Sequence, residues 1–307
     1  RAIRDRGLTI TGPIESFTQS LPAFTPDDVD GRRQTVFLAV KAQHTEAAAR
    51  QLEPHLATDG AVVSLQNGFN ELAIAHVVGP ERTMGAFINF GADLIEPGVV
   101  HFGGRGAVVI GELDGRESPR ADDLRRALAH FEPAATVTDN IWGYLWGKMG
   151  YGAILFATAL TNASIVDVLD SPDARPVLTE LAREVMAVAE AEGVIAMGFN
   201  GYDPAAFAPA TTAATGGSAS AIDASFAAMA AFNRRSAKTH TGVWRDIAVH
   251  HRKTEAEAQF TPILTIAHRR GILVPRLERL VGLMRDVEIG VRPQQWTNLS
   301  ELNAHSL

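Results

Sequence analysis

Cysteine is absent from the 307 residues of this sequence. Its absence excludes disulfide bonds, catalysis by a thiolate and metal sites with cysteine ligands, and it fits a reducing cytoplasm. Long hydrophobic runs are also absent, since no apolar stretch reaches the ~18–20 residues needed to span a membrane. The net charge of -7 argues against binding to nucleic-acid phosphates irrespective of their sequence. We therefore expect a cytoplasmic protein with no membrane partner and no nucleic-acid partner.

Lysine is the other scarce residue. Of the 28 basic residues, 24 are arginines, and the lysines are Lys41, Lys148, Lys238 and Lys253. An ammonium group can lose its proton when water is removed from it, whereas a guanidinium group effectively never does. A lysine kept against this bias therefore suggests a site where arginine would not serve. Lys148 lies among aromatic and apolar residues at 141–150, which favours a catalytic lysine over one that merely extends from an apolar helix to water.

The first part of the chain alternates between apolar runs and amphipathic segments. The pattern predicts strands at 8–10, 35–40, 61–65, 83–90, 98–102, 107–111 and 135–138, with helices at 45–56, 71–78 and 119–131. Continuous apolar runs such as 35–40 are typical of parallel strands covered on both faces. We therefore predict an α/β domain with a doubly wound parallel sheet over residues 1–139. The helix end at 1–6, closed by Gly7, predicts that the chain begins partway through this domain.

From Asn140 onward the sequence changes to helical patterns. Helices are predicted at 141–160, 177–193, 255–268 and 275–289, and residues 204–231 are predicted to form one or two helices with a flexible link at 211–218. Apolar residues in the second helix recur at helical spacing, from Leu178 to Val188. We therefore predict an all-α domain over residues 140–307, without an extensive sheet.

Polar residues follow two of the predicted strands, where ligands bind in doubly wound sheets. Lys41 comes directly after the strand at 35–40, and Gln66, Asn67 and Gly68 follow the strand at 61–65. A lysine there can meet a phosphate or a ribose hydroxyl, and the asparagine amide both donates and accepts hydrogen bonds. The glycine would let the backbone approach a ligand closely. Asn-Gly is also ordinary turn chemistry, so these residues alone leave both interpretations open.

A basic segment covers residues 238–255, with two lysines, three histidines and two arginines. Such a segment attracts an anionic substrate, although most basic runs are solvated loops. His250 and His251 are adjacent, so their side chains diverge, and we predict no metal site. Glu255 opens a predicted helix, where an acidic residue also complements the helix dipole.

Four of these residues lie in segments that resemble the ketopantoate reductases (2-dehydropantoate 2-reductases). The segments Val40-Lys41, Ser64–Gly68, Leu145–Lys148 and Thr254-Glu255 occur in the same order and with similar spacing in that family. The resemblance extends over essentially the whole chain, because 84–85, 97–101 and 271–275 also match the family. It implies an N-terminal Rossmann domain that binds NADPH and a helical C-terminal domain for substrate and catalysis.

The resemblance also implies roles for individual residues. Lys148 matches the proton donor to the carbonyl oxygen of the substrate, which needs a proton and a nearby positive charge as hydride arrives from the nicotinamide. Glu255 matches an acidic residue near this lysine and the cofactor ribose. Gly91 falls where a backbone contact to the cofactor is expected. The resemblance thus assigns catalysis to Lys148 and Glu255, and cofactor binding to Lys41, Gln66, Asn67, Gly68 and Gly91.

The sequence departs from the family at several positions. The first Rossmann strand and its glycine-rich phosphate loop are missing, together with the arginine that reads the ribose 2′-phosphate, so NADP rests on the resemblance alone. Gly152 and Phe156 stand where the family has asparagines that hold ketopantoate. Thr241 or Gly242 replaces a substrate-binding serine. We therefore expect a substrate less hydroxylated and more apolar than ketopantoate.

The expected function is reduction of a small-molecule 2-oxo acid by NADPH, as in pantothenate biosynthesis. The residues expected to line the substrate are Gly152, Phe156, Thr241 and Arg245. Two alternatives stay open: a non-catalytic relative that binds a small acid, and another hydroxyacid or opine dehydrogenase of the same superfamily. Lys148 argues against the first, because a binding role could be filled by the arginine that this composition favours. The sequence leaves the oligomeric state open, with a homodimer as one outcome.

Overall fold

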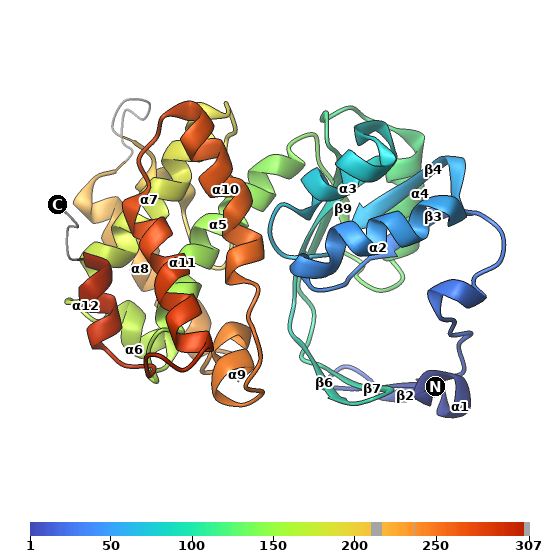
Figure 1. The fold of residues 1–307 in the computed structure, drawn as a ribbon, viewed down its shortest axis with the longest axis horizontal. Coiled ribbons are helices and arrows are strands. Elements are labelled where there is room, and N and C mark those ends of the chain that lie inside the picture. The colour runs from blue at the N-terminus through green and yellow to red at the C-terminus, as the bar shows by residue number, and fades with distance from the viewer. Residues whose placement is uncertain (210–216, 237, 304–307) are drawn as a thin grey trace. The chain divides into compact units, whose positions relative to one another are not determined.

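The computed structural model describes residues 1–209, 217–236 and 238–303. They form two compact units, of which the first comprises Arg1–Gln66 with Asn70–Ile141 and the second comprises Asn67–Phe69 with Trp142–Leu307 (Figure 1). The chain therefore passes from the first unit to the second two residues after the end of the predicted sheet domain. The short segment Asn67–Phe69 is an exception, since it packs with the helical unit.

The main sheet of the first unit has five strands in the spatial order β3-β4-β5-β8-β9. Their bounds are β3 Arg33–Leu38, β4 Leu56–Ser64, β5 Thr83–Asn89, β8 Ala107–Glu112 and β9 Thr136–Val137. β3, β4 and β5 are parallel, but β8 pairs antiparallel with β5 and β9 pairs parallel with β8. The α/β sheet is thus confirmed, whereas its description as parallel throughout is wrong for β8 and β9.

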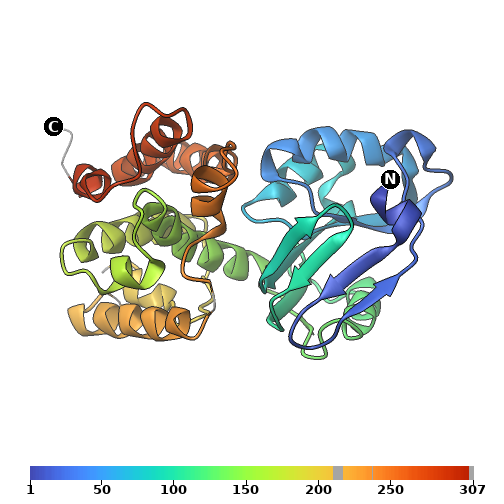
Figure 2. The ribbon, with the colours of Figure 1, turned by 90° about the horizontal axis from the view of Figure 1, so that it is seen from below.

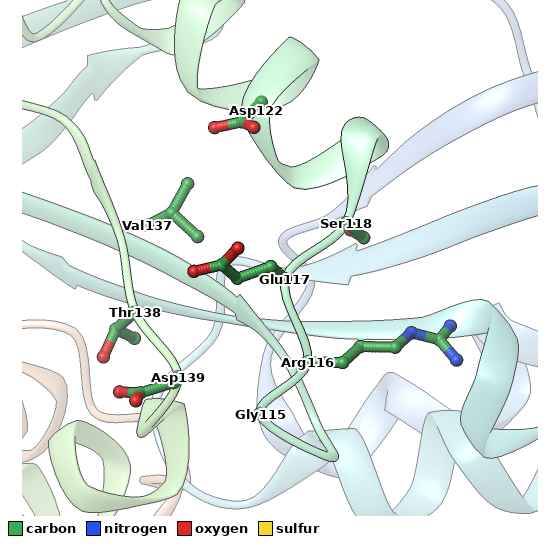
Figure 3. A pocket seen from close by; sticks show the side chains of 8 residues that line it. All are labelled: Gly115, Arg116, Glu117, Ser118, Asp122, Val137, Thr138 and Asp139. Atoms are coloured by element: carbon green, nitrogen blue, oxygen red, sulfur yellow. The ribbon is translucent and has the colours of Figure 1, made fainter.

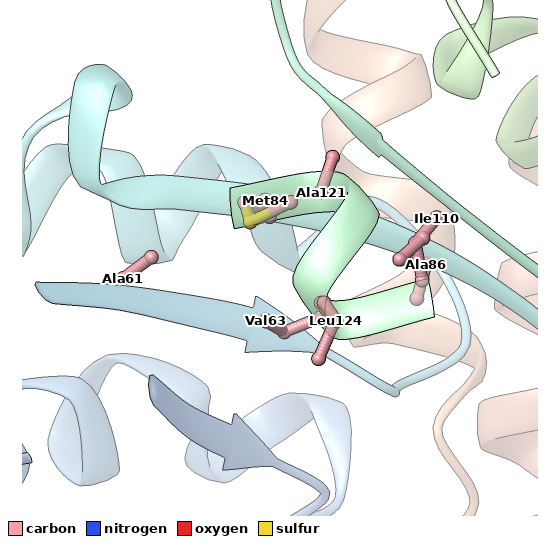
Figure 4. Close-up of a cluster of buried hydrophobic side chains, with 7 residues drawn as sticks. All are labelled: Ala61, Val63, Met84, Ala86, Ile110, Ala121 and Leu124. Carbon is pink, nitrogen blue, oxygen red and sulfur yellow. The ribbon is translucent and has the colours of Figure 1, made fainter. Parts of the chain in front are cut away.

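Helices cover both faces of this sheet. They are α2 Thr45–Leu52, α3 Asn70–Val78 and α4 Pro119–Leu128. On one face Val63, Met84 and Ile110 pack with Ala121 and Leu124 of α4 (Figure 4). On the other face a second buried cluster forms, made of Leu38, Leu56, Val62, Ile74 and Val78. Burial on both faces explains the continuous apolar run of β4. The run at 35–40 does not fit this expectation, because β3 lies at the edge of the sheet and is mostly exposed.

A second sheet of four strands lies in the same unit, in the order β2-β1-β7-β6 (Figure 2). Its strands are β1 Leu8–Thr11, β2 Phe17–Gln19, β6 Ala92–Glu96 and β7 Val99–Phe102, and α1 Ala2–Arg6 precedes it. β1 pairs antiparallel with β2 and parallel with β7, and β6 pairs antiparallel with β7. The predicted strand at 98–102 therefore belongs to this sheet. The sequence does not predict it, because β2 and β6 are mostly exposed and lack a clear apolar alternation.

The second unit is helical. Its helices are α5 Ile141–Thr158, α6 Ile165–Asp170, α7 Arg175–Ala191, α8 Ala219–Arg234, α9 Gly242–Ala248, α10 Ala256–Arg270, α11 Pro275–Glu288 and α12 Thr297–Asn303. Beyond residue 141, the only β pairing in the described residues is an isolated bridge between Phe199 and Tyr202. The predicted helical domain is confirmed, and the region predicted as one or two helices at 204–231 contains a 3-10 turn at Pro204–Phe207 and α8. Most of the predicted link at 211–218 lies outside the described residues.

None of the helices in the described ranges is long and apolar enough to cross a membrane.

Candidate functional site

Lys148 lies on the single accessible face of α5. From Gly143 onward, the residues of this helix that are not buried are Tyr144, Lys148, Gly152 and Leu155. They are spaced four, four and three residues apart, so they lie on one side of the helix. We call these four residues the Lys148 stripe. The other residues of α5 from Gly143 onward are buried, so Lys148 is a half-buried cation on a largely apolar helix.

Glycines let the rest of α5 pack closely against the segment around Met197. The N–H of Met197 donates to the carbonyl oxygen of Gly143 at 2.9 Å. A Cβ atom at Gly147 would overlap the carbonyl oxygen of Met197, and one at Gly150 would overlap the hydroxyl of Tyr202. The glycine of the Trp-Gly-Lys motif therefore also serves packing. The segment around Met197 lies directly against Gly147, and this contact fixes the rotation of the helix that carries Lys148.

The segment carrying Asn67 packs on two helices of the second unit. The ring of Phe69 lies 4.6 Å from that of Trp146 on α5, measured between centroids. Gly68 has a φ of +92°, and a Cβ there would come within 3.0 Å of Gln259 on α10. The positive φ and the close approach of Gln259 both favour glycine at 68 on structural grounds, whether or not a ligand approaches it. Asn67 itself is exposed, so its position beside α5 and α10 leaves its amide accessible.

Glu255 is the residue from which α10 begins. Its carbonyl oxygen accepts the N–H of Gln259 at 2.9 Å, and its side chain is half-buried. Because Gln259 is also the residue against Gly68, Glu255 lies one helical turn from the Asn67 segment. α5 and α10 are in contact themselves, since the rings of Phe156 and Phe260 meet edge to face at 5.0 Å. The second unit thus brings together the segments that carry Asn67, Lys148 and Glu255.

The remaining predicted cofactor residues lie in the first unit. Gln66 is buried, and its Nε2 donates to the carbonyl oxygen of Val40 and to Oγ1 of Thr45, both at 2.7 Å. Thr45 in turn donates to Oδ1 of Asn70 at 2.8 Å. These bonds join the turn that carries Lys41, which is exposed, to the loop that leads into Asn67. The described contacts of Gln66 are therefore structural, and its contact with a cofactor stays a prediction.

Gly91 lies between β5 and β6, where the chain leaves the main sheet for the second sheet. Its carbonyl oxygen accepts the N–H of Gly103 at 2.7 Å. Because this bond uses its carbonyl group, the predicted backbone contact to a cofactor would fall to its N–H or to the second lone pair of the oxygen.

The predicted substrate residues divide into two groups. Gly152 belongs to the Lys148 stripe, and a Cβ there would meet no heavy atom within 4 Å among the described residues. Phe156 is buried against Phe260 in the helical core. Thr241 accepts the N–H of Trp244 at 3.0 Å and so caps α9, and Arg245 is half-buried one turn further along that helix. The stripe therefore offers open space at Gly152 and an apolar side chain at Leu155, which the sequence did not single out.

Two cations of the basic segment, Arg252 and Lys253, pair with acidic side chains. Arg252 binds Oδ1 of the buried Asp246 through Nε at 2.9 Å and through a second nitrogen at 2.6 Å. Lys253 pairs with Glu257 at 2.9 Å, and Arg285 pairs with the same carboxylate at 2.7 Å. Arg252 and Lys253 thus help to hold the segment between α9 and α10, and the attraction of the segment for an anionic substrate stays a prediction.

A separate pocket of about 440 Å³ lies in the first unit (Figure 3). It is lined by Gly115, Arg116, Glu117, Ser118, Asp122, Val137, Thr138 and Asp139. Arg116, Glu117, Asp122 and Asp139 are exposed, and none of the predicted site residues lines it. In the described parts of the chain no group of three or more histidine, aspartate or glutamate side chains could hold a metal ion. The charged side chains of this pocket are therefore exposed to water, and the pocket is a weaker candidate for an active site than the Lys148 stripe.

Two sequence profiles of one protein family match the chain. The profile described as ketopantoate reductase PanE/ApbA matches residues 1–115, and the profile described as ketopantoate reductase PanE/ApbA C terminal matches residues 140–288. Together they cover most of the chain, one on each side of the change from sheet to helix. A 2-dehydropantoate 2-reductase from Halobacterium salinarum is 31% identical over 196 residues, which are 62% of this chain and 64% of that protein. The chain thus spans less than two thirds of the length of this curated relative.

Solved structures share the fold. A D-mandelate dehydrogenase solved with NADH and anilino(oxo)acetate has a TM-score of 0.77 at 18% identity, over 99% of this chain and 88% of that one. A 2-dehydropantoate 2-reductase from Geobacter metallireducens has a TM-score of 0.77 at 23% identity, over 93% of this chain and 88% of that one. These likenesses support the arrangement of a Rossmann-like sheet domain followed by a helical domain.

Proposed function

This chain belongs to the ketopantoate reductase family, and from that membership we propose that it is an oxidoreductase that uses NADPH to reduce the keto group of a 2-oxo acid. The relative from Halobacterium salinarum is a 2-dehydropantoate 2-reductase. The observation that carries the proposal is the position of Lys148, which is a half-buried cation on the one accessible face of an apolar helix. A lysine in that setting is suited to donate a proton.

The residues present fit a nicotinamide cofactor. Lys41 follows β3 and Asn67 follows β4, and both side chains are exposed, as contacts to phosphate, ribose or carboxamide require. Directly beside Asn67, Oε1 of Gln66 is a buried acceptor that receives no hydrogen bond from the described residues. By the family resemblance, Lys41 and Asn67 would contact the cofactor, which supplies a hydride when bound. A D-mandelate dehydrogenase of the same fold was solved with NADH, and NADPH follows here from the family resemblance.

The role of Lys148 follows from charge balance. When a hydride adds to the carbonyl carbon of a 2-oxo acid, the C–O double bond opens and negative charge develops on the oxygen. The ammonium group of Lys148 stabilises that charge and then transfers a proton to the oxygen, which yields a 2-hydroxy acid. By the family resemblance, Glu255 is an acidic residue near the lysine and the cofactor ribose, and the lysine regains its proton from water before the next turnover.

The Lys148 stripe supports a substrate with an apolar body. One turn after the lysine, Gly152 offers open space instead of an amide, and Leu155 follows with an apolar side chain. A substrate with hydroxyl groups at these positions would leave them without partners, at a cost of ~1–3 kcal/mol for each. The 2-oxo acid is therefore less hydroxylated than ketopantoate.

If Lys148 serves only as a positive charge, a second function is favoured, in which the protein binds a small acid without catalysing its reduction. Another hydroxyacid or opine dehydrogenase of the same superfamily would share the chemistry but not the substrate. Replacing Lys148 separates these functions. Lys148→Met should lower turnover on the order of 10²–10⁴-fold, which is the usual effect of losing a positioned proton donor.

Lys148→Arg is the decisive companion variant, because it keeps the charge but cannot release a proton at neutral pH. It should recover little activity. The enzyme is expressed from its complete reading frame and assayed by loss of NADPH absorbance with a set of 2-oxo acids. Arg126→Met, which removes an exposed cation paired with Asp123 on α4, serves as the control. Near-normal turnover of Lys148→Arg would refute proton donation by Lys148, and binding of 2-oxo acids without reduction by the wild type would favour the non-catalytic relative.

A further inference from the structure

Glu288 is an acidic residue in an unfavourable local position. It is the last residue of α11, where the negative end of the helix dipole disfavours a carboxylate. Its side chain is half-buried, which adds to that cost. A carboxylate held in such a place is explained by what it binds elsewhere in the fold.

The partner of Glu288 is Thr254, which precedes Glu255. Oε1 of Glu288 accepts the backbone N–H of Thr254 at 2.9 Å and also the hydroxyl of Thr254. Thr254 is buried, with 2% of its surface exposed, so the Thr254 ends of both bonds are shielded from water, which strengthens them. The same hydroxyl oxygen accepts the N–H of Ala256 at 3.1 Å.

These bonds fix the backbone on both sides of Glu255. On the N-terminal side, Thr254 is held by Glu288. On the C-terminal side, Ala256 is held by the Thr254 hydroxyl, and the carbonyl oxygen of Glu255 accepts the N–H of Gln259. The direction in which the Glu255 side chain leaves the backbone therefore depends on a carboxylate 33 residues further along the chain.

We infer that Glu288 is a positioning residue, which holds Glu255 in the orientation needed for reduction at Lys148. This inference rests on the proposed function, since it assigns Glu288 a part in the same site. Glu288 acts through Thr254 and touches neither substrate nor cofactor.

Two measurements test this role, and the first is independent of activity. Glu288→Gln removes the charge but keeps an acceptor of similar shape. Hydrogen exchange is followed by mass spectrometry in peptides that cover 252–260 and, for comparison, 177–189 in α7. We expect exchange to rise about tenfold or more in 252–260 alone. Unchanged exchange there, or an equal rise in both segments, would overturn the inference, because the second result indicates a general loss of stability.

The second measurement is a double-mutant cycle with Glu255→Gln. If Glu288 acts through Glu255, Glu288→Gln should lower kcat several-fold in the wild type but less than twofold in the Glu255→Gln enzyme. If Glu288→Gln lowers kcat by the same factor in the wild type and in the Glu255→Gln enzyme, the inference is overturned. Glu278 lies on the same helix and faces the exposed His268 at 3.7 Å, so Glu278→Gln is the matched control and should leave kcat unchanged.

The cycle also separates this inference from the proposed function. If Glu255→Gln turns over as the wild type does, or if the wild type reduces no 2-oxo acid, the role proposed for Glu255 fails, and the exchange measurement alone decides whether Glu288 holds the segment. Thr254→Val, which deletes only the hydroxyl, should reproduce part of the exchange effect, and Thr254→Ser should restore protection.

Discussion

The carbonyl oxygen of Met197 occupies the space that a Cβ atom at Gly147 would need. The same segment donates the N–H of Met197 to Gly143, so the chain around residue 197 lies directly on the backbone of α5. This contact leaves the helix little freedom to rotate about its axis. Since Lys148 is the next residue, the packing at Gly147 helps to determine where the lysine points.

Gly147→Ala is therefore expected to destabilise the protein. Helix propensity favours alanine over glycine by ~1 kcal/mol, but the added methyl group must displace the Met197 carbonyl, at a cost of ~1–3 kcal/mol or more. Gly152→Ala, in the same helix, adds its methyl group to open space and should gain ~0.5–1 kcal/mol. Urea unfolding of both variants measures the contrast. Equal gains would show that the segment around Met197 does not pack on α5 in this way.

The ion pair between Glu112 and Arg120 leads us to expect that the folded protein loses stability in acid. Burial of Glu112 alone would raise the pKa of its carboxyl group, but hydrogen bonds from Arg120 and Ser118 outweigh burial and hold that pKa below its ordinary value. A depressed pKa stabilises the folded state above the ordinary carboxyl value, ~4.3, and this contribution is lost as the pH falls through the lower, folded value.

Glu112→Gln should thus cost ~1–3 kcal/mol at pH 7, because Arg120 loses its charged partner but stays partly exposed to water and keeps its bond to the carbonyl oxygen of Glu81. The difference from the wild type should shrink below about pH 4. Glu46→Gln is the exposed counterpart, since Glu46 pairs with Arg50 at 2.6 Å on the surface of α2, and it should cost less than ~1 kcal/mol. Denaturant unfolding between pH 3 and pH 7 measures the loss in free energy of unfolding for both variants. A deficit of Glu112→Gln that stays constant with pH would contradict the ion pair.

The long elements of the fold follow from sequence periodicity, whereas the second sheet does not. β4 has a buried apolar run, and α7 and α11 place apolar residues at helical spacing. The exposed strands β2 and β6 have no such pattern. Strand direction is also invisible to periodicity, so the reversal of β8 against β5 could not be foreseen.

The candidate site shows the same division. The composition predicts Lys148 as a site residue, and the segments that resemble the family predict Asn67 and Glu255. The Lys148 stripe could not be predicted, because α5 is apolar all round and its exposed face depends on which neighbours cover the others. Glu288 was missed because its partner, Thr254, is distant along the chain and joined to it only by folding.

Gln66 and Asn67 are adjacent but should respond differently to substitution. Gln66→Met leaves Val40 O and Thr45 Oγ1 without their donor. The loss should cost ~1–3 kcal/mol for the buried Thr45 hydroxyl and less for Val40, which is exposed. Asn67→Ala changes an exposed side chain and should alter stability by less than ~0.5 kcal/mol, while weakening NADPH binding. Urea unfolding and titration of NADPH fluorescence separate the two effects. Unchanged NADPH affinity of Asn67→Ala would remove Asn67 from the cofactor site.

Gly152→Asn tests the substrate proposal, because it places an amide on the Lys148 stripe in space that the structure leaves open. A new hydrogen bond to a substrate hydroxyl or carboxylate should improve kcat/KM for ketopantoate relative to an apolar 2-oxo acid by about tenfold, which corresponds to ~1.4 kcal/mol. Phe156→Asn should not do so, since Phe156 is packed against Phe260 and its loss costs ~3–5 kcal/mol of stability. Both variants and the wild type are assayed with NADPH and a panel of 2-oxo acids. If ketopantoate is already the best substrate of the wild type by kcat/KM, the argument from Gly152 is wrong, while membership of the family is unaffected.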